Sequence, residues 1–146
     1  MPVIRAVLER KGSAVYTIRH DETVFQAITR MATWNVGALV VLDDDGVCGI
    51  VSERDYLRRV ALEQRSSHST RVGEIMSSPV VCVEPEHSVE HALAVMTRER
   101  CRHLPVVSDR ALAGLVSIGD LVRQGVHDLE AEVRHLRDYI DGRYPG

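Results

Sequence analysis

The chain has 146 residues, of which 45% are apolar and 27% charged, and its formal net charge is −3. This length and apolar content suit one compact domain with a core of ordinary size. The charge balance argues against a general nucleic-acid binder, which usually has a basic excess. No apolar run approaches the roughly 20 residues that a membrane helix needs, so we expect neither nucleic acid nor a membrane among the partners.

The N-terminal residues predict a short helix rather than a secretory signal. Apolar residues recur at helical spacing from Val3 to Leu8, and Gly12 ends the pattern. Charged residues run through the first turns, unlike the apolar stretch of a signal peptide. Residues 1–12 are assigned to this helix.

Residues 13–63 predict a unit of order β-α-β-β-α. The segment Asp21–Thr23 offers capping residues, and the apolar stripe that begins at Val24 has helical spacing. The segment Asp43–Gly46 is typical of a turn between two strands. In order, the predicted elements are a strand at 16–18, a helix around 24–31, a strand at 38–42, a strand at 47–51 and a helix opened by Ser52.

Residues 75–125 predict the same order a second time. The polar residues before them lead us to assign 64–74 to a linker, with a loop over 64–70. In order, the predicted elements are a strand at 80–83, a helix around 89–96, strands at 104–107 and 112–116, and a helix that includes 121 and 122.

Residues 126–146 are assigned to a C-terminal helix and tail. The apolar positions from Val126 to Ile140 alternate in steps of three and four, which is the heptad spacing of a coiled-coil seam. The seam is two heptads long, shorter than an independent coiled coil needs. Two interpretations stay open: the helix docks on its own domain, or it also pairs across a dimer.

The two predicted units are an internal repeat. Residues 15–57 align without a gap with residues 80–122 at a constant offset of 65, and eleven of the 43 pairs are identical. Each unit alone has a size at which a core is marginal, so we expect the halves to fold against each other.

The repeat preserves a short motif, Gly-x-x-Ser-x-x-Asp, at Gly49–Asp55 and at Gly114–Asp120. Ser at the start of a helix with an acidic residue three positions on is the pattern of a capping box, and a single copy would be no more than that. Two equivalent copies suggest a site, with each glycine leaving room for something to approach the backbone. The helix N-terminus and the hydroxyl suit a phosphate, and the carboxylate suits the two hydroxyls of a ribose.

On these motifs the chain resembles a tandem pair of CBS domains, often called a Bateman module, over residues 15–122. Two further matching segments are Glu74–Val80, which leads into the second repeat, and Arg102–Val107. The resemblance implies a mixed α/β (α+β) fold in which two β-α-β-β-α repeats pack about a pseudo-twofold axis, with extra terminal helices. It also implies two clefts that commonly bind adenosine nucleotides.

The resemblance assigns roles to residues of both repeats. Ser52 and Asp55, and in the second repeat Ser117 and Asp120, are the expected contacts to phosphate and ribose. The base is expected against the first strand of a repeat, which means Tyr16 and Thr17 or Val81 and Cys82. The segment Ile75–Pro79 leads into the second repeat only, so the second base pocket matches the family more closely than the first.

The repeats differ in their basic residues, which we expect to distinguish their clefts. Arg102 and His103 stand where the first repeat has Gly37-Ala38, and Arg54 stands where the second has Gly119. These three cations are candidates for phosphate contact, because guanidinium groups match phosphate oxygens; otherwise they are solvated surface groups. An imidazole beside phosphate predicts a raised pKa for His103 and nucleotide affinity that rises from about pH 8 to about pH 6.

Metal binding and catalysis find little support in the sequence. His87 and His91 share a face at helical spacing, but no third ligand completes a metal site, so we expect no metal. No arrangement of Ser, His and Asp or of Cys and His suggests nucleophilic catalysis. The three cysteines, Cys48, Cys82 and Cys101, are read as buried free thiols of a cytoplasmic protein.

The favoured function is a regulatory module that senses AMP, ADP or ATP and signals to an unknown regulated protein, as a homodimer. NAD or S-adenosylmethionine is the alternative ligand. A structural interaction module without ligand is the second hypothesis, and an enzyme is the third.

Overall fold

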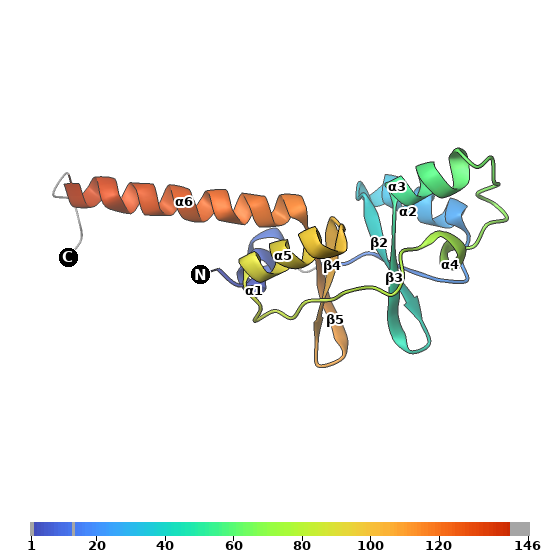
Figure 1. The fold of residues 1–146 in the computed structure, drawn as a ribbon, viewed down its shortest axis with the longest axis horizontal. Coiled ribbons are helices and arrows are strands. Elements are labelled where there is room, and N and C mark those ends of the chain that lie inside the picture. The colour runs from blue at the N-terminus through green and yellow to red at the C-terminus, as the bar shows by residue number, and fades with distance from the viewer. Residues whose placement is uncertain (1, 13, 141–146) are drawn as a thin grey trace.

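The computed structural model describes residues 2–12 and 14–140 of the chain. Two small sheets stand side by side with helices around them, and one long helix projects away from the rest (Figure 1). The first sheet has the order β1-β2-β3, with β1 parallel to β2 and β3 antiparallel to it. The second sheet is an antiparallel pair of β4 and β5.

The strands are β1 (Thr17–Arg19), β2 (Ala38–Asp43), β3 (Gly46–Ser52), β4 (His103–Ser108) and β5 (Ala111–Ser117). The helices are α1 (Ile4–Lys11), α2 (Val24–Trp34), α3 (Glu53–Tyr56), the π-helical turn η1 (Leu57–Ala61), α4 (Val72–Ile75), α5 (Val89–Glu99) and α6 (Ile118–Ile140). The mixed α/β class and the repeated order predicted from the sequence are confirmed for the first unit.

Local signals explain the boundaries of α2. Thr23 accepts from the backbone of Gln26 while the Gln26 side chain accepts from the backbone of Thr23, a capping box at the predicted start. Asn35 ends the helix in the left-handed conformation that this residue type tolerates. The predicted apolar stripe is buried at Val24, Ala27 and Met31.

The second unit lacks a regular counterpart of β1, so the predicted strand at 80–83 is wrong in extent. Val83 alone bridges to β4, at Val106. In the first unit Val40 donates its backbone N–H to the carbonyl of Tyr16 at 3.2 Å. The residue equivalent to Val40 is Pro105, which has no N–H to donate, so the ladder cannot extend in the same way.

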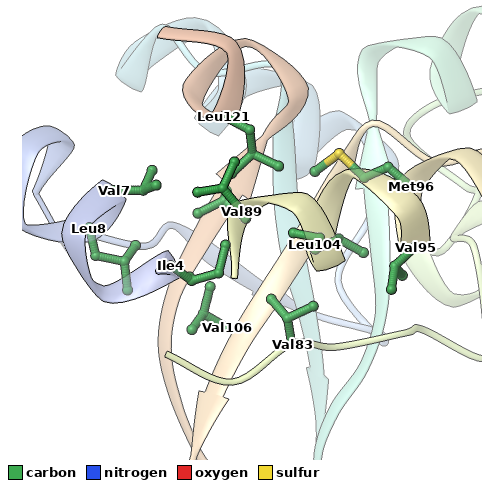
Figure 2. Packing of buried hydrophobic residues seen from close by; sticks show 12 residues of the cluster. Ile4, Val7, Leu8, Val83, Val89, Val95, Met96, Leu104, Val106 and Leu121 are labelled. Atoms are coloured by element: carbon green, nitrogen blue, oxygen red, sulfur yellow. The ribbon is translucent and has the colours of Figure 1, made fainter. Parts of the chain in front are cut away.

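The segment that leads into each repeat completes the core of the other repeat. In Figure 2 Ile4, Val7 and Leu8 of α1 point into the cluster formed by the second unit, and Ile4 is fully buried there. In the same way Val72 and Ile75 of α4 are fully buried in the core of the first unit. The two halves are therefore connected by helices that each pack into the core of the other half.

The linker is more ordered than a polar loop. The short helix α4 begins within the residues assigned to the linker, and its first buried residue is Val72. Thr70, the last residue of the predicted loop, is buried and donates its hydroxyl to the carbonyl of Ser66 at 2.7 Å.

The last helix of the second unit and the C-terminal helix are one element, α6, with no break near residue 126. Its buried residues, Asp120, Leu121 and Gln124, all lie near its start. The seam from Val126 to Ile140 is exposed, with exposed fractions between 40% and 78%, so the interpretation that it docks on its own domain is wrong. Residues 141–146 of the predicted tail lie outside the described part of the chain. No helix in the described part has the length and apolar character of a membrane span.

Candidate functional site

Both Ser-x-x-Asp motifs form capping boxes at the ends of equivalent strands. Asp55 Oδ2 accepts from the backbone N–H of Ser52 at 2.9 Å, and Ser52 Oγ accepts from the N–H of Asp55 at 3.2 Å. The corresponding distances for Ser117 and Asp120 are 2.8 and 3.1 Å. The helix-capping role predicted from the pattern is thus confirmed. The capping box holds a hydroxyl and a carboxylate together at the start of each helix.

The glycine of each motif is approached by protein atoms. A Cβ on Gly49 would lie 2.7 Å from Met76 Sδ and 2.8 Å from the carbonyl oxygen of Ser77. A Cβ on Gly114 would lie 2.6 Å from Leu8 Cδ2. The space predicted beside each glycine is therefore occupied by the segment that leads into the opposite repeat. A bound ligand is not needed to explain why glycine stands at these positions.

The first site has a carboxylate with spare hydrogen-bonding capacity. Asp55 Oδ2 also accepts from the Ser52 hydroxyl at 3.1 Å, whereas Oδ1 has no protein donor among residues 2–12 and 14–140. On the neighbouring strand Ser52 pairs with Ala38, which is buried. Arg54 is exposed on α3.

Tyr16 and Thr17, the residues expected near the base of the first site, lie at the start of β1. The Tyr16 ring stacks on Trp34 with centroids 4.6 Å apart and planes 20° apart. The carbonyl of Thr17 accepts from Arg30 at 3.2 Å, and Arg30 also pairs with Glu22. Trp34 was not predicted from the sequence, although it is the only tryptophan of the chain.

The second site has a carboxylate that is already fully engaged. Asp120 is 9% exposed; its Oδ2 accepts from Lys11 Nζ at 2.6 Å and its Oδ1 accepts from Arg123 at 2.7 Å. Burial alone would raise the pKa of Asp120, but the hydrogen bonds from Lys11 and from the Ser117 backbone outweigh it and hold the pKa below its ordinary value. Lys11 also donates to the carbonyl of Leu115 at 2.8 Å.

His103 lies beside this cluster, paired across the sheet with Ser117. Burial lowers the pKa of His103; Asp120 counteracts the shift, while Lys11 and Arg102 add to it. Without a bound phosphate the pKa of His103 is thus lowered by its protein surroundings, and the raised pKa expected beside a phosphate stays a prediction.

The remaining predicted residues of the second site are more dispersed. Arg102 is exposed, and its carbonyl accepts from the N–H of Ile118 at 2.9 Å. Val81 packs against the core of the second unit, and Cys82 is half-buried beside it. The described part of the chain therefore brings Ser117, Asp120 and His103 together, and leaves Arg102 at the surface.

A cavity of about 140 Å³ adjoins Asp120. It is lined by Val7, Arg10, Lys11, Asp120, Arg123 and Gln124. Ligand pockets for drug-sized molecules usually measure about 300–1,000 Å³, so this cavity is small for a nucleoside.

A larger hollow of about 550 Å³ lies near α4, but it contains none of the predicted site residues. Arg71, which lines this hollow, donates to the backbone carbonyl of Asp21 at 3.2 Å.

Two residues of the second site were missed by sequence reasoning, Lys11 and Arg123. Arg123 follows Asp120 by one helical turn, and this spacing is a usable signal. Lys11 is the only lysine in the chain, but nothing in its local sequence indicates Asp120 as its partner. The two are 109 residues apart.

The histidines and cysteines show no further site within the described residues. The rings of His87 and His91 are 4.4 Å apart, and no group of three or more metal-ligating side chains is found there. Cys48, Cys82 and Cys101 are free and half-buried, and burial raises the pKa of each thiol. Raised thiol pKa values disfavour the reactive thiolate.

A protein-family model of the CBS domain matches the chain twice, over residues 10–62 and 72–127. The chain belongs to the CBS domain family. Each CBS repeat contains one Ser-x-x-Asp motif, so the family and the tandem organisation predicted from the sequence are confirmed.

Known CBS proteins are similar over most of the chain. The mitochondrial CBS domain-containing protein CBSX3 of Arabidopsis thaliana is 45% identical over 129 residues, which cover 85% of this chain. The chain spans 63% of the length of that relative. A CBS-domain structure from Burkholderia ambifaria, whose name places it in signal transduction, is also 45% identical, with a TM-score of 0.81. The match covers 86% of this chain and 95% of that chain.

A more distant structure is the CBS domain pair of protein MJ0100, solved in complex with 5′-methylthioadenosine and S-adenosyl-L-methionine. It has a TM-score of 0.76 at 20% identity and covers 88% of this chain and 98% of that chain. At this identity the likeness shows a shared fold.

Proposed function

We propose that this CBS pair is a regulatory module that binds an adenosyl ligand and signals its occupancy to a partner protein. The observation that carries the proposal is the Asp55 carboxylate, fixed at the start of α3 with one oxygen free of protein donors in the described part of the chain. A ribose diol donates two hydrogen bonds, which such a carboxylate can accept. AMP, ADP and ATP are the preferred ligands, with NAD and S-adenosylmethionine as alternatives.

Two further observations support this ligand class. Tyr16, one of the residues expected near the base, stacks on Trp34, and Trp34 is 40% exposed, which supports stacking of a base there. The MJ0100 pair, which shares the fold, binds two adenosyl compounds. The proposal is of binding and signalling, in keeping with the signal-transduction name of the Burkholderia ambifaria structure.

A thermal-shift screen with AMP, ADP, ATP, NAD and S-adenosylmethionine tests the ligand. A ligand present at 100 times its dissociation constant stabilises the folded chain by about 2.7 kcal/mol. We expect a clear rise in melting temperature with at least one adenosyl compound and none with uridine nucleotides. A flat response to all of them favours a structural interaction module, and turnover of a bound nucleotide by the pure protein favours an enzyme.

We further infer that two copies of the chain pair through α6. The apolar seam from Val126 to Ile140 is exposed along its whole length, and such a stripe is a partner surface. Charges that flank the seam would be complementary by heptad position: Glu132 would face Arg137 of a parallel copy, and Glu130 would face Arg137 of an antiparallel copy. A CBS-CP12 protein of bloom-forming cyanobacteria, 30% identical with a TM-score of 0.76, is hexameric, which supports assembly of this chain.

Sedimentation equilibrium tests this pairing. The wild-type chain is expected at twice its 16.3 kDa mass. Leu129→Glu places a charge in the seam and is expected to give single chains, whereas Ala131→Glu, on the opposite face of α6, keeps the doubled mass. A wild-type mass of one chain, or equal behaviour of the two variants, contradicts pairing through the seam.

The compartment that we propose is a reducing one, such as the cytoplasm. The three cysteines are free in the structure, and burial raises the pKa of their thiols. The Arabidopsis relative carries a mitochondrial name, which belongs to that protein.

A further inference from the structure

The two carboxylates of the repeated motif have different neighbours. Asp120 Oδ2 accepts from Lys11 and from the Ser117 backbone, and its Oδ1 accepts from Arg123. Asp55 has no cation on either oxygen within the described residues. A ribose that donates to Asp120 must therefore displace a cation, and a ribose that donates to Asp55 need not.

The cation comes from the helix that leads into the opposite repeat. Leu8 of α1 and Met76 after α4 take equivalent places, since they cover the motif glycines Gly114 and Gly49 of the opposite repeat. Lys11 ends α1 and bonds to Asp120 and to the carbonyl of Leu115. Among the described residues no ammonium group lies in this way beside Asp55.

The strength of the Lys11 contact follows from its surroundings. Asp120 is buried, and the Lys11 side chain is 33% exposed, so the pair is shielded from solvent more than a surface ion pair. Removing one partner from a shielded pair leaves the other charge poorly compensated. The neutral hydroxyls of a ribose are weak competitors for such a carboxylate.

We propose that Lys11 closes the second cleft to ribose, so that each chain binds one adenosyl ligand, in the first cleft beside Asp55. This inference rests on the proposed function and specifies which of the two clefts performs it. The aromatic pair of Tyr16 and Trp34 agrees with this assignment. In the second repeat the equivalents of that pair are Val81 and Glu99, which cannot stack on a base in the same way.

Titration calorimetry with AMP, and with ATP as a second probe, measures the number of ligands per chain. Wild type is expected to bind one equivalent and to change the fluorescence of Trp34, the only tryptophan, in step with the heat. Asp55→Asn is expected to weaken this binding at least tenfold and to abolish the fluorescence change. Lys11→Met, which removes the ammonium group and keeps an unbranched side chain of similar length, is expected to bind a second equivalent that leaves Trp34 unchanged.

Arg10→Met is the matched control. Arg10 lines the same cavity and carries the same charge, but it is not one of the groups that hold Asp120. Its removal is expected to leave one equivalent per chain, which separates loss of the Lys11 contact from a general change of charge. Circular dichroism melting checks each variant, and Lys11→Gln replaces Lys11→Met if the latter does not fold.

The outcomes separate this inference from the proposed function. Two equivalents for wild type, or one for a folded Lys11 variant, overturn the role of Lys11 and leave adenosyl binding intact. Binding of AMP or ATP by Asp55→Asn as tightly as by wild type overturns the choice of the first cleft. Absence of binding by wild type to every adenosyl compound refutes the proposed function itself.

Discussion

The two repeats share their motif and their order of elements, yet they are stabilised differently. In the first repeat Arg30 forms two hydrogen bonds to Glu22 and one to the carbonyl of Thr17. The equivalent residue of the second repeat is Val95, which is buried in the core. Conversely, the second repeat has the Lys11–Asp120 pair, and the first has no counterpart in the described residues. The two repeats therefore share their order of helices and strands, although their polar side-chain contacts differ.

This difference shows that a repeated motif is not a repeated site. The local contacts of the motif, the capping boxes, are the same in both repeats because they depend on residues three positions apart. The availability of the carboxylate depends on a side chain from the opposite end of the chain. Asp120 is distinguished from Asp55 by this contact from Lys11 and by the hydrogen bond from Arg123, one turn further along α6.

The largest expected effect tests the exchange of lead-in helices. Ile4→Ala and Ile75→Ala each remove a fully buried side chain from the core of the opposite repeat, so each is expected to lower the free energy of unfolding by about 2–5 kcal/mol. Urea denaturation measures the loss. The control is Leu62→Ala, whose parent side chain is 78% exposed. A loss for Ile4→Ala no larger than for this control contradicts the placement of α1 in the second core.

A smaller effect distinguishes the two glycines. Gly49→Ala brings a Cβ against the backbone oxygen of Ser77, which cannot move cheaply, and is expected to destabilise the chain by about 1–3 kcal/mol. Gly114→Ala meets the end of the Leu8 side chain, which can rotate away, so a lower cost is expected. The same denaturation series compares them, and a reversed order is inconsistent with the described packing.

The smallest effect is the pH dependence contributed by His103. Its folded pKa is lowered by burial, so the unfolded chain takes up a proton first as the pH falls below the ordinary histidine pKa of about 6.5. The free energy of unfolding is therefore expected to decrease between pH 7 and pH 5. His103→Ala, which copies Ala38 of the first repeat, is expected to reduce this decrease, and the exposed His127→Ala is the control.

The response of Asp120 occupies a separate pH window. Its folded pKa is lowered, so its contribution to stability is present above the unfolded value of about 3.9 and is lost as the pH falls through the folded pKa. Measurements between pH 7 and pH 5 thus report on His103 with Asp120 still ionised. If His103→Ala and His127→Ala give the same pH profile, the buried environment described for His103 is wrong.

The sequence predicted the elements well where the signals are local. The helix at Val24, the turn at Asp43–Gly46 and both capping motifs follow from spacing and capping chemistry within a few residues. The strand at 80–83 failed because its partner contains Pro105, and a missing N–H on a neighbouring strand is not visible in the apolar pattern of the segment itself. The site residues were predicted as equivalent pairs, and the pairing of Asp120 with Lys11 was missed.

The amino-acid sequence by itself determined the repeat, the secondary structure of most elements and the two capping motifs, because these depend on neighbours along the chain. The tertiary structure decided which helix completes which core, that the seam of α6 is exposed, and which carboxylate holds a cation. These outcomes depend on residues that folding brings together across the chain, as with Lys11 and Asp120, which lie 109 positions apart. Hydrophobic periodicity predicts which side chains are buried, but it does not predict which residues they pack against.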